Sequence, residues 1–356
     1  MKKMFLFAAM ACVALASCTK NEPVNVPQED AITFAAPVVG LNTKAVEIKT
    51  DYPTDVNFSV FAHYFTGNYS TLTDGKLYMN DVETAYDATL VAWNSATNYY
   101  WPKQGTLTFA AYSPSSVAAE YDVTGLKFND FVVPATAAEQ YDLLFSERAY
   151  NQTKDEMTTA EDPYKGVQIK FNHALSSVLF KVKTDKDYSA DNFQINVTKI
   201  EVKGVHGKGS FNQGLEDTDG SLTKSKTEHA GWTPDATAAL CDYVAFEGDQ
   251  VLTTTAVVTE NVVSGNFVNN TNLILLPQEL PADAALYVEY TIYNNNTGVT
   301  IPQNATVKLD AYGSVSHWLR GNRYKYTLTI GLDKIYFDPT VAEWVSVDAG
   351  DVTIGK

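Results

Sequence analysis

Alternation of apolar and polar residues recurs along this chain and constrains its fold more than any other feature. Successive side chains of a β-strand point to opposite faces, so a period of two places one set in a core and the other in solvent. Repeated alternation of this kind is typical of antiparallel sheets with one buried face. The sequence therefore predicts an all-β fold. The alternating segments are 32–36, 58–64, 107–111, 167–171, 178–182, 193–197, 252–258, 286–292 and 324–330.

Turn residues separate the alternating segments, and helical periodicity is scarce. Examples are the glycine-containing stretches 204–209 and 294–298. Many strands with few helices favour antiparallel β-sandwiches of the Greek-key kind. The weakest pattern, over residues 151–165, is rich in charge and suggests a boundary. A chain of 356 residues is long enough for two domains, and we predict two sandwiches in series, 31–164 and 165–356.

The start of the chain has the features of an export signal. Two lysines precede an apolar run of residues 4–15, which is too short to span a bilayer. The run ends in Leu-Ala-Ser-Cys at 15–18, which resembles the bacterial lipobox, whose cysteine sulfur receives a diacylglycerol. We predict a removed signal peptide over 1–17, lipidation of Cys18, and a flexible tether over 18–30.

Charge and cysteine content argue against a nucleic-acid-binding protein and against a fold held by disulfides. The formal charge is −16, and removal of the two lysines of the signal leaves −16 − 2 = −18. Such an acidic chain is a poor partner for nucleic acid or for an anionic lipid surface, because affinity for both comes from Lys and Arg. Cys12 leaves with the signal and Cys18 is lipidated, so Cys241 stands alone. With no disulfide possible, stability must come from a large core.

No residue pattern typical of catalysis or metal binding occurs in the sequence. The five histidines lack zinc-site spacing, and we expect His173 and His317 to be hydrogen-bonded residues at strand ends. The Asp-Thr-Asp-Gly stretch at 217–220 resembles half a calcium loop but lacks the closing glutamate, so it is interpreted as a turn. We therefore predict a non-enzymatic protein without cofactor or metal. An envelope enzyme is the least favoured hypothesis. Catalysis by two carboxylates requires a set distance between them in space, and nothing in the sequence singles out such a pair.

An aromatic cluster occupies Tyr99-Tyr100-Trp101-Pro102. Its rings could stack on sugars or fill the core of a sandwich. The alternating segment 107–111 follows at once as a candidate hairpin partner, which favours the core.

Several blocks, in their order and spacing, resemble the fimbrillin-like lipoproteins of Bacteroidetes, which are type V pilins. The resemblance covers nearly the whole mature chain. The blocks are Ile-Thr-Phe-Ala-Ala-Pro at 32–37, Asn-Phe-Ser-Val-Phe-Ala at 57–62, Tyr-Trp-Pro at 100–102 with 107–112, Phe-Asn-His-Ala-Leu-Ser at 171–176, and 318–330.

The resemblance implies two transthyretin-like sandwiches that assemble by donor-strand exchange. In such pilins a trypsin-like protease cuts after a basic residue beyond the first strand, and a strand of the next subunit fills the vacated groove. Here the cut would match Lys44–Ala45, although an uncut loop lysine is the alternative. The displaced strand would contain Ile32, Phe34 and Ala36. The donor would be the tail, which pairs within its own domain in the alternative, and its apolar residues are Trp344, Val345, Val347, Val352 and Ile354.

We therefore expect a fimbrial or adhesion subunit at the surface of the outer membrane. Its partners would be copies of itself or other pilin subunits, and the membrane through acylated Cys18. The alternative is a monomeric surface lipoprotein that binds a glycan or a host protein.

Overall fold

The computed structural model describes residues 31–39, 50–122, 125–154, 166–214, 231–255, 257–258, 272–310, 315–332 and 335–343. Regular structure in these ranges is almost entirely β. Its helical elements are three short 3-10 turns, η2 (Leu72–Asp74), η3 (Ala137–Glu139) and η5 (Ser189–Asp191). The predicted all-β class is confirmed. Among these residues no helix has the length and hydrophobicity to cross a bilayer.

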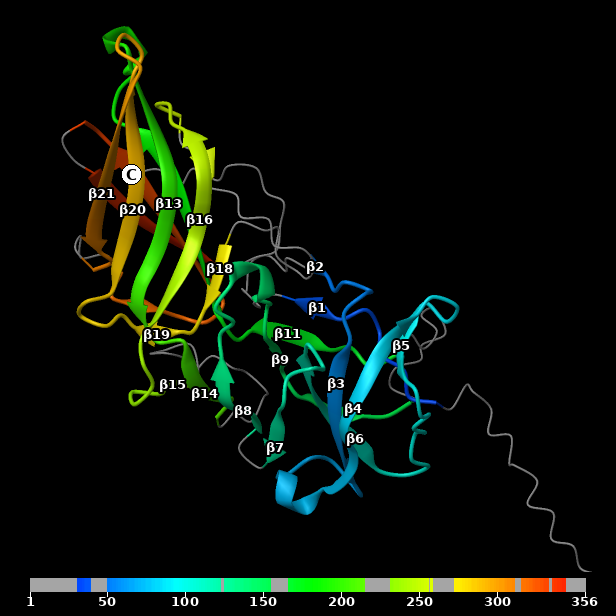
Figure 1. Cartoon of the computed structure of the whole chain (residues 1–356). Coiled ribbons are helices and arrows are strands. Elements are labelled where there is room, and N and C mark those ends of the chain that lie inside the picture. Colours follow the sequence, from blue (N-terminus) through cyan, green and yellow to red (C-terminus); the bar gives the residue numbers. More distant parts are fainter. Residues whose placement is uncertain are drawn as a thin grey trace, which may run out of the picture.

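The strands alternate with short turns along the whole described chain (Figure 1). They are β1 (Val38–Val39), β2 (Thr50–Asp51), β3 (Phe58–Phe65), β4 (Lys76–Asp87), β5 (Ala92–Ser95), β6 (Thr106–Ser113), β7 (Glu120–Asp122), β8 (Gly125–Val132), β9 (Leu144–Ser146), β10 (Ala149–Gln152), β11 (Lys170–His173), β12 (Ser176–Thr184), β13 (Phe193–Val205), β14 (Lys208–Asn212), β15 (Trp232–Pro234), β16 (Cys241–Val251), β17 (Val257–Val258), β18 (Asn272–Leu275), β19 (Gln278–Glu279), β20 (Ala285–Asn294), β21 (Val299–Lys308), β22 (His317–Trp318), β23 (Asn322–Ile330) and β24 (Ile335–Glu343).

The N-terminal sheet has the order β2-β1-β11-β9-β6-β3-β4-β5, with β10 beside β6. Alternation on β3 explains why this strand contributes buried side chains to both faces of the sheet. Phe58 and Val60 belong to one hydrophobic cluster of the N-terminal strands, whereas Phe61 belongs to a second cluster that extends through the rest of the chain. One sheet therefore contributes to both cores.

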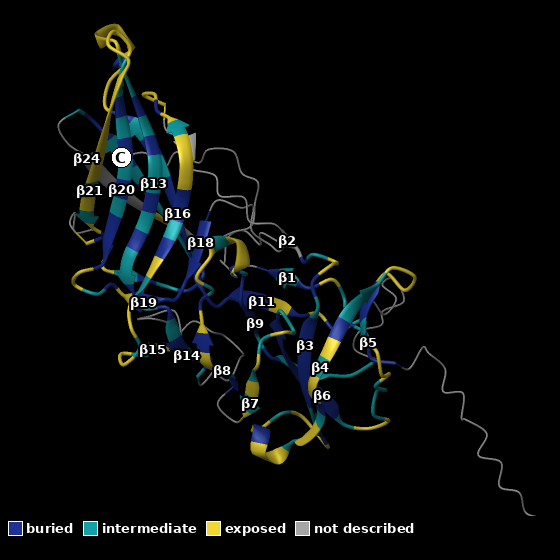
Figure 2. Ribbon diagram, in the orientation of Figure 1, coloured by how far each residue is buried: buried dark blue, intermediate teal, exposed yellow. Residues whose placement is uncertain are grey.

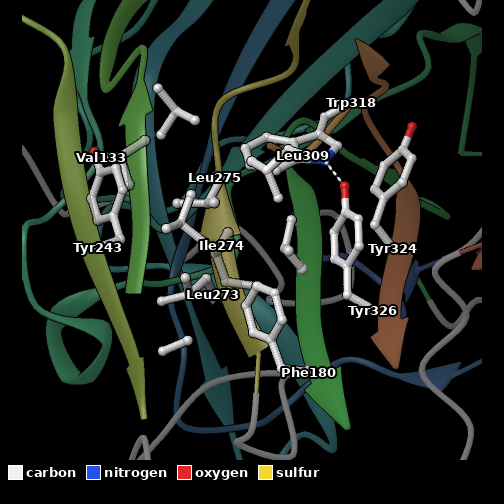
Figure 3. Close-up of a cluster of buried hydrophobic side chains, with 14 of the residues drawn as sticks. Val133, Phe180, Tyr243, Leu273, Ile274, Leu275, Leu309, Trp318, Tyr324 and Tyr326 are labelled. Atoms are coloured by element: carbon white, nitrogen blue, oxygen red, sulfur yellow. Dashed lines mark hydrogen bonds between the residues drawn. The ribbon is translucent and has the colours of Figure 1, made fainter. Parts of the chain in front are cut away.

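Among the described residues, the C-terminal half contains the two-stranded sheet β19-β22 and two larger sheets. One has the order β17-β12-β23-β24 with β18 beside β12, and the other has the order β16-β13-β20-β21. Buried and more accessible positions alternate along β20, as predicted from the sequence (Figure 2). In the core, the indole N–H of Trp318 donates to the hydroxyl of Tyr326 (2.9 Å), whose ring stacks on that of Phe180 (5.6 Å between centroids) (Figure 3). Burial of large side chains on this scale supplies the main stabilisation of a chain without described disulfides.

A further sheet, β15-β14-β8-β7, combines strands from both sides of residue 164. In addition, β11 pairs with β9 in the N-terminal sheet although it follows residue 165. Backbone pairing therefore continues across the predicted boundary. The division into 31–164 and 165–356 stays a prediction, as does the transthyretin-like detail.

Candidate functional site

The first described segment, residues 31–39, lies between two other parts of the N-terminal half. Towards β5 and the residues after it, the pairing is antiparallel. The amide of Ile32 donates to the carbonyl oxygen of Tyr99 (2.7 Å), and Phe34 and Trp93 exchange two backbone bonds (2.7 and 2.9 Å). This side of the segment is thus hydrogen-bonded as in a regular ladder.

The other side of the segment pairs in parallel with residues 167–171. The amide of Val167 donates to the carbonyl of Thr33 (2.8 Å), and the amide of Val38 donates to the carbonyl of Ile169 (3.1 Å). Strand β1, at the end of the segment, pairs in parallel with β11. Residues 31–34 therefore fill a slot one strand wide, between residues 93–100 and residues 167–171, and β1 continues the segment between β2 and β11.

Side chains of the first segment are anchored in the core of the N-terminal half. Ile32 is 3% exposed and Phe34 is fully buried. The Phe34 ring packs edge-on against Phe58 (5.8 Å between ring centroids) and Phe109 (5.7 Å). Burial of such a side chain contributes roughly 1.5–3 kcal/mol. The slot is therefore both hydrogen-bonding and apolar.

The predicted site residues fall into two groups. Ile32 and Phe34 point into the core, while Ala36 is exposed, so the alternation ends before that position. Cys18, Lys44 and Ala45 lie outside the described residues, as does the tail with Trp344, Val345, Val347, Val352 and Ile354. The roles assigned to all these residues stay predictions.

Residues that form the walls of the slot were missed by the sequence analysis. Trp93 is 1% exposed, packs edge-on against Tyr52 (5.0 Å between centroids), and forms two backbone bonds with Phe34. Its signal was a single tryptophan in the short run Ala-Trp-Asn-Ser at 92–95. Gly166 was missed as well, since no pattern marks the glycine that precedes Val167.

A buried contact between a histidine and a carboxylate lies at the end of β11, outside the slot. Nδ1 of His173, at the end of β11, lies 2.7 Å from Oδ2 of Asp142, and both side chains are almost fully buried. His173 is thus a hydrogen-bonded strand-end residue, as predicted. Burial raises the pKa of Asp142, whereas His173 and the guanidinium of Arg323 oppose that rise. Such a pair can fix the position of β11.

His317 is the second histidine expected at a strand end. It begins β22, and its Nδ1 lies 2.7 Å from the Ser316 hydroxyl. Within the described ranges, no group of three or more His, Cys, Asp or Glu side chains could hold a metal ion. The stretch 217–220 lies outside these ranges.

The aromatic cluster at 99–102 lies at one end of the N-terminal core and is half-buried. The Trp101 ring packs edge-on against Phe109 (6.1 Å between centroids), and Tyr99 against Tyr78 (5.9 Å). Both partners link the cluster to the core, as the sequence favoured, but the expected hairpin with 107–111 is wrong. Strand β6 pairs instead with β3, β9 and β10.

Comparison with known proteins gives a consistent result. A family model described as fimbrillin-like matches residues 43–344. A crystal structure described as a candidate cell adhesion protein from Bacteroides uniformis superposes with a TM-score of 0.54 at 15% identity, covering 90% of this chain and 100% of that one. A fimbrial protein from Bacteroides vulgatus gives a TM-score of 0.53 at 17% identity, covering 88% and 100%. At such identities these structures show a shared fold. No curated protein matches the sequence.

Proposed function

The chain belongs to the fimbrillin-like family, and from that premise we propose that it is a non-enzymatic fimbrial or adhesion subunit that assembles by strand exchange. The observation that carries this proposal is the pairing of residues 31–39 on both sides within an apolar slot. A terminal segment held in this way can be replaced by another strand of similar pattern.

Loss of the first segment would leave two rows of backbone groups without partners. The carbonyls of Trp93, Tyr99 and Ile169 and the amide of Val167 would face an empty slot. Unpaired strand edges of this kind readily accept an added strand. In the replacement, backbone bonds provide affinity, and alternate side chains in the places of Ile32 and Phe34 provide register.

The proposed trigger is a cut at Lys44–Ala45, in the sequence that follows the first segment. After this cut, residues 31–39 would be retained only by their hydrogen bonds and buried side chains. We propose the C-terminal tail of another copy, or of a related pilin, as the replacing strand. Its apolar residues alternate at Val345 and Val347, as a donor strand requires.

We further propose that acylated Cys18 holds the uncut protein at the outer membrane, at the cell surface. Several acyl chains on one residue anchor firmly, because each buried CH₂ contributes about 0.8 kcal/mol. The second candidate function is a monomeric lipoprotein that binds glycans. The half-buried rings of Tyr78, Tyr99 and Trp101 favour it, since aromatic faces stack on sugars.

Limited proteolysis of the mature chain with a trypsin-like protease tests strand exchange. Intact mass should show an early cut after Lys44, and a native gel should then show a ladder of oligomers that survives mild denaturant. Lys44→Gln should abolish both results, while the matched change Lys49→Gln should leave them intact. A cut chain that stays monomeric with both fragments bound would contradict strand exchange and favour the monomeric lipoprotein.

A further inference from the structure

The described chain begins at one end of the N-terminal core, beside the aromatic cluster. Ala31 forms an antiparallel bridge with Tyr100. Thirteen residue steps separate Cys18 from Ala31 (31 − 18 = 13). A fully extended chain of that length reaches at most roughly 45 Å. An anchor at Cys18 therefore keeps Ala31 within roughly 45 Å of the membrane.

Aromatic side chains gather at this end from three separate elements. The Tyr78 hydroxyl donates to the carbonyl of Tyr100 (2.5 Å), and the Tyr78 and Tyr99 rings lie edge to face. We call the group the aromatic rim. All its members are half-buried, and all of them except Tyr100 pack against the N-terminal core. The rim consists of Tyr64, Tyr78, Tyr99, Tyr100 and Trp101.

Two exposed lysines border the aromatic rim. Lys76 pairs directly with Tyr64 across β3 and β4, so the two side chains lie on one face. Lys103 lies in the turn that follows Trp101. Neither lysine forms an ion pair with another described residue. The nearest acid in sequence to Lys76 is Asp74, whose carboxylate accepts bonds from the hydroxyls of Ser70 and Thr71 (2.6 and 2.8 Å).

This combination is unusual on a chain whose expected mature charge is −18. Tyrosine and tryptophan favour the headgroup region of a bilayer, because their rings are amphipathic. A lysine near an anionic surface adds roughly 1 kcal/mol of attraction. An acidic protein tethered at a membrane would otherwise be repelled by anionic headgroups.

We propose that the aromatic rim, with Lys76 and Lys103, is a membrane-contact surface that seats the anchored protein on the lipid headgroups. The occupant is the bilayer that holds the Cys18 anchor, because the chain leads from that anchor into the rim. The inference rests on the proposed anchoring at Cys18. It also gives the uncut protein a defined orientation, in which the first segment emerges at the membrane-facing end.

Tryptophan quenching on vesicles tests this proposal. The mature chain with Cys241→Ser carries Cys18 as its one thiol, which is coupled to a maleimide lipid in phosphatidylethanolamine/phosphatidylglycerol vesicles with brominated acyl chains. We expect brominated vesicles to quench part of the tryptophan emission. Trp101→Phe should lose most of that quenching, whereas Trp344→Phe should retain it. Lys76→Glu with Lys103→Glu should reduce it, and the circular dichroism of each variant reports folding.

Each other outcome overturns the proposal. Quenching that is absent from the parent, or that is unchanged by Trp101→Phe, removes the rim from the membrane surface. A blue shift of Trp101 emission with rising protein concentration, without vesicles, would identify the rim as a contact between copies. A blue shift on adding soluble oligosaccharide instead would make it a glycan site. The anchor is installed chemically, so the vesicle experiment does not depend on acylation of Cys18 in cells. It does not depend on strand exchange either, which the protease experiment tests separately.

Discussion

Gly166 approaches Phe34 so closely that a Cβ atom on Gly166 would lie 2.5 Å from the carbonyl carbon of Phe34. The φ angle of Gly166 is +103°, a backbone conformation that residues with a Cβ atom rarely adopt. Two independent constraints therefore require glycine where the first segment meets residues 167–171. The wall of the slot is built to fit a backbone at that position.

Gly166→Ala should loosen the first segment. The added methyl group must push the Phe34 backbone away or change the local φ angle, at a cost of roughly 1–3 kcal/mol. Hydrogen exchange of residues 31–39 should accelerate, and the urea midpoint of unfolding should fall. Gly67→Ala is the matched control, because nothing lies within 4 Å of its Cβ position. Unchanged exchange in Gly166→Ala would mean that the slot tolerates a wider gap than the structure has.

Phe34→Ala should destabilise the protein by about 3–5 kcal/mol, because it leaves a cavity between Phe58 and Phe109. The same change should speed loss of the first segment after a cut at Lys44, since the ring is its largest buried group. Urea unfolding measures the first effect, and intact mass over time measures the second. Ala36→Ser, at an exposed position, should change neither. Equal release rates for both variants would argue that backbone bonds alone hold the segment.

Much of this slot follows from sequence, and some of it does not. Alternation at Ile32 and Phe34 predicted buried positions correctly, because the period of a strand reports which side faces a core. It could not identify the neighbours of the strand. Trp93 and Val167 are 59 and 133 residues from Phe34 (93 − 34 and 167 − 34). Pairings at such separations depend on topology, which a local pattern does not encode.

Local patterns also fail where buried polar contacts are made. The sequence predicted a hydrogen-bonded His173 but gave no sign of its partner, because Asp142 lies in a loop before β9. The expected hairpin between residues 99–102 and residues 107–111 was wrong because of the strand order of the sheet. Strand β6 is saturated by β3 on one side and by β9 and β10 on the other, so a near neighbour in sequence had no edge to occupy.

His173→Phe should cost about 3–5 kcal/mol at neutral pH, because it leaves the Asp142 carboxylate buried without its hydrogen-bonded partner. The loss should also depend on pH. Arg323 still lowers the pKa of Asp142, but burial dominates, and loss of His173 raises that pKa further above the ordinary 3.8. The folded state then binds a proton more tightly than the unfolded state, so stability is gained at low pH and lost as pH rises through the raised pKa.

Urea unfolding of His173→Phe at pH 5 and at pH 8 measures this dependence. The variant should be closer to the parent in stability at pH 5 than at pH 8. Asp142→Asn in the same background removes the titrating group, so the double variant should lose the difference between the two pH values. A larger deficit at pH 5 would contradict the assigned sign.

Prolines at two sheet edges should keep the C-terminal half out of strand addition. In the described part of the chain, β21 pairs only with β20 and β24 only with β23. Pro302 lies opposite Thr291 and Pro339 opposite Tyr326, and both ladders continue unbroken past them. A proline has no N–H, so an unbroken ladder places its nitrogen on the outer edge, where an added strand would need a donor.

Replacing both prolines by threonine should therefore restore the missing donors and allow edge-to-edge association. Sedimentation velocity of the uncut mature protein should show concentration-dependent oligomers for Pro302→Thr with Pro339→Thr, and monomer for the parent. Pro302→Lys with Pro339→Lys restores the same N–H groups but adds charge, which protects natural edges, so this control should stay monomeric. If the threonine variant also stays monomeric, another part of the chain covers the edges of β21 and β24. The prolines would then not be the reason why strands add at the slot of the first segment and not at these edges.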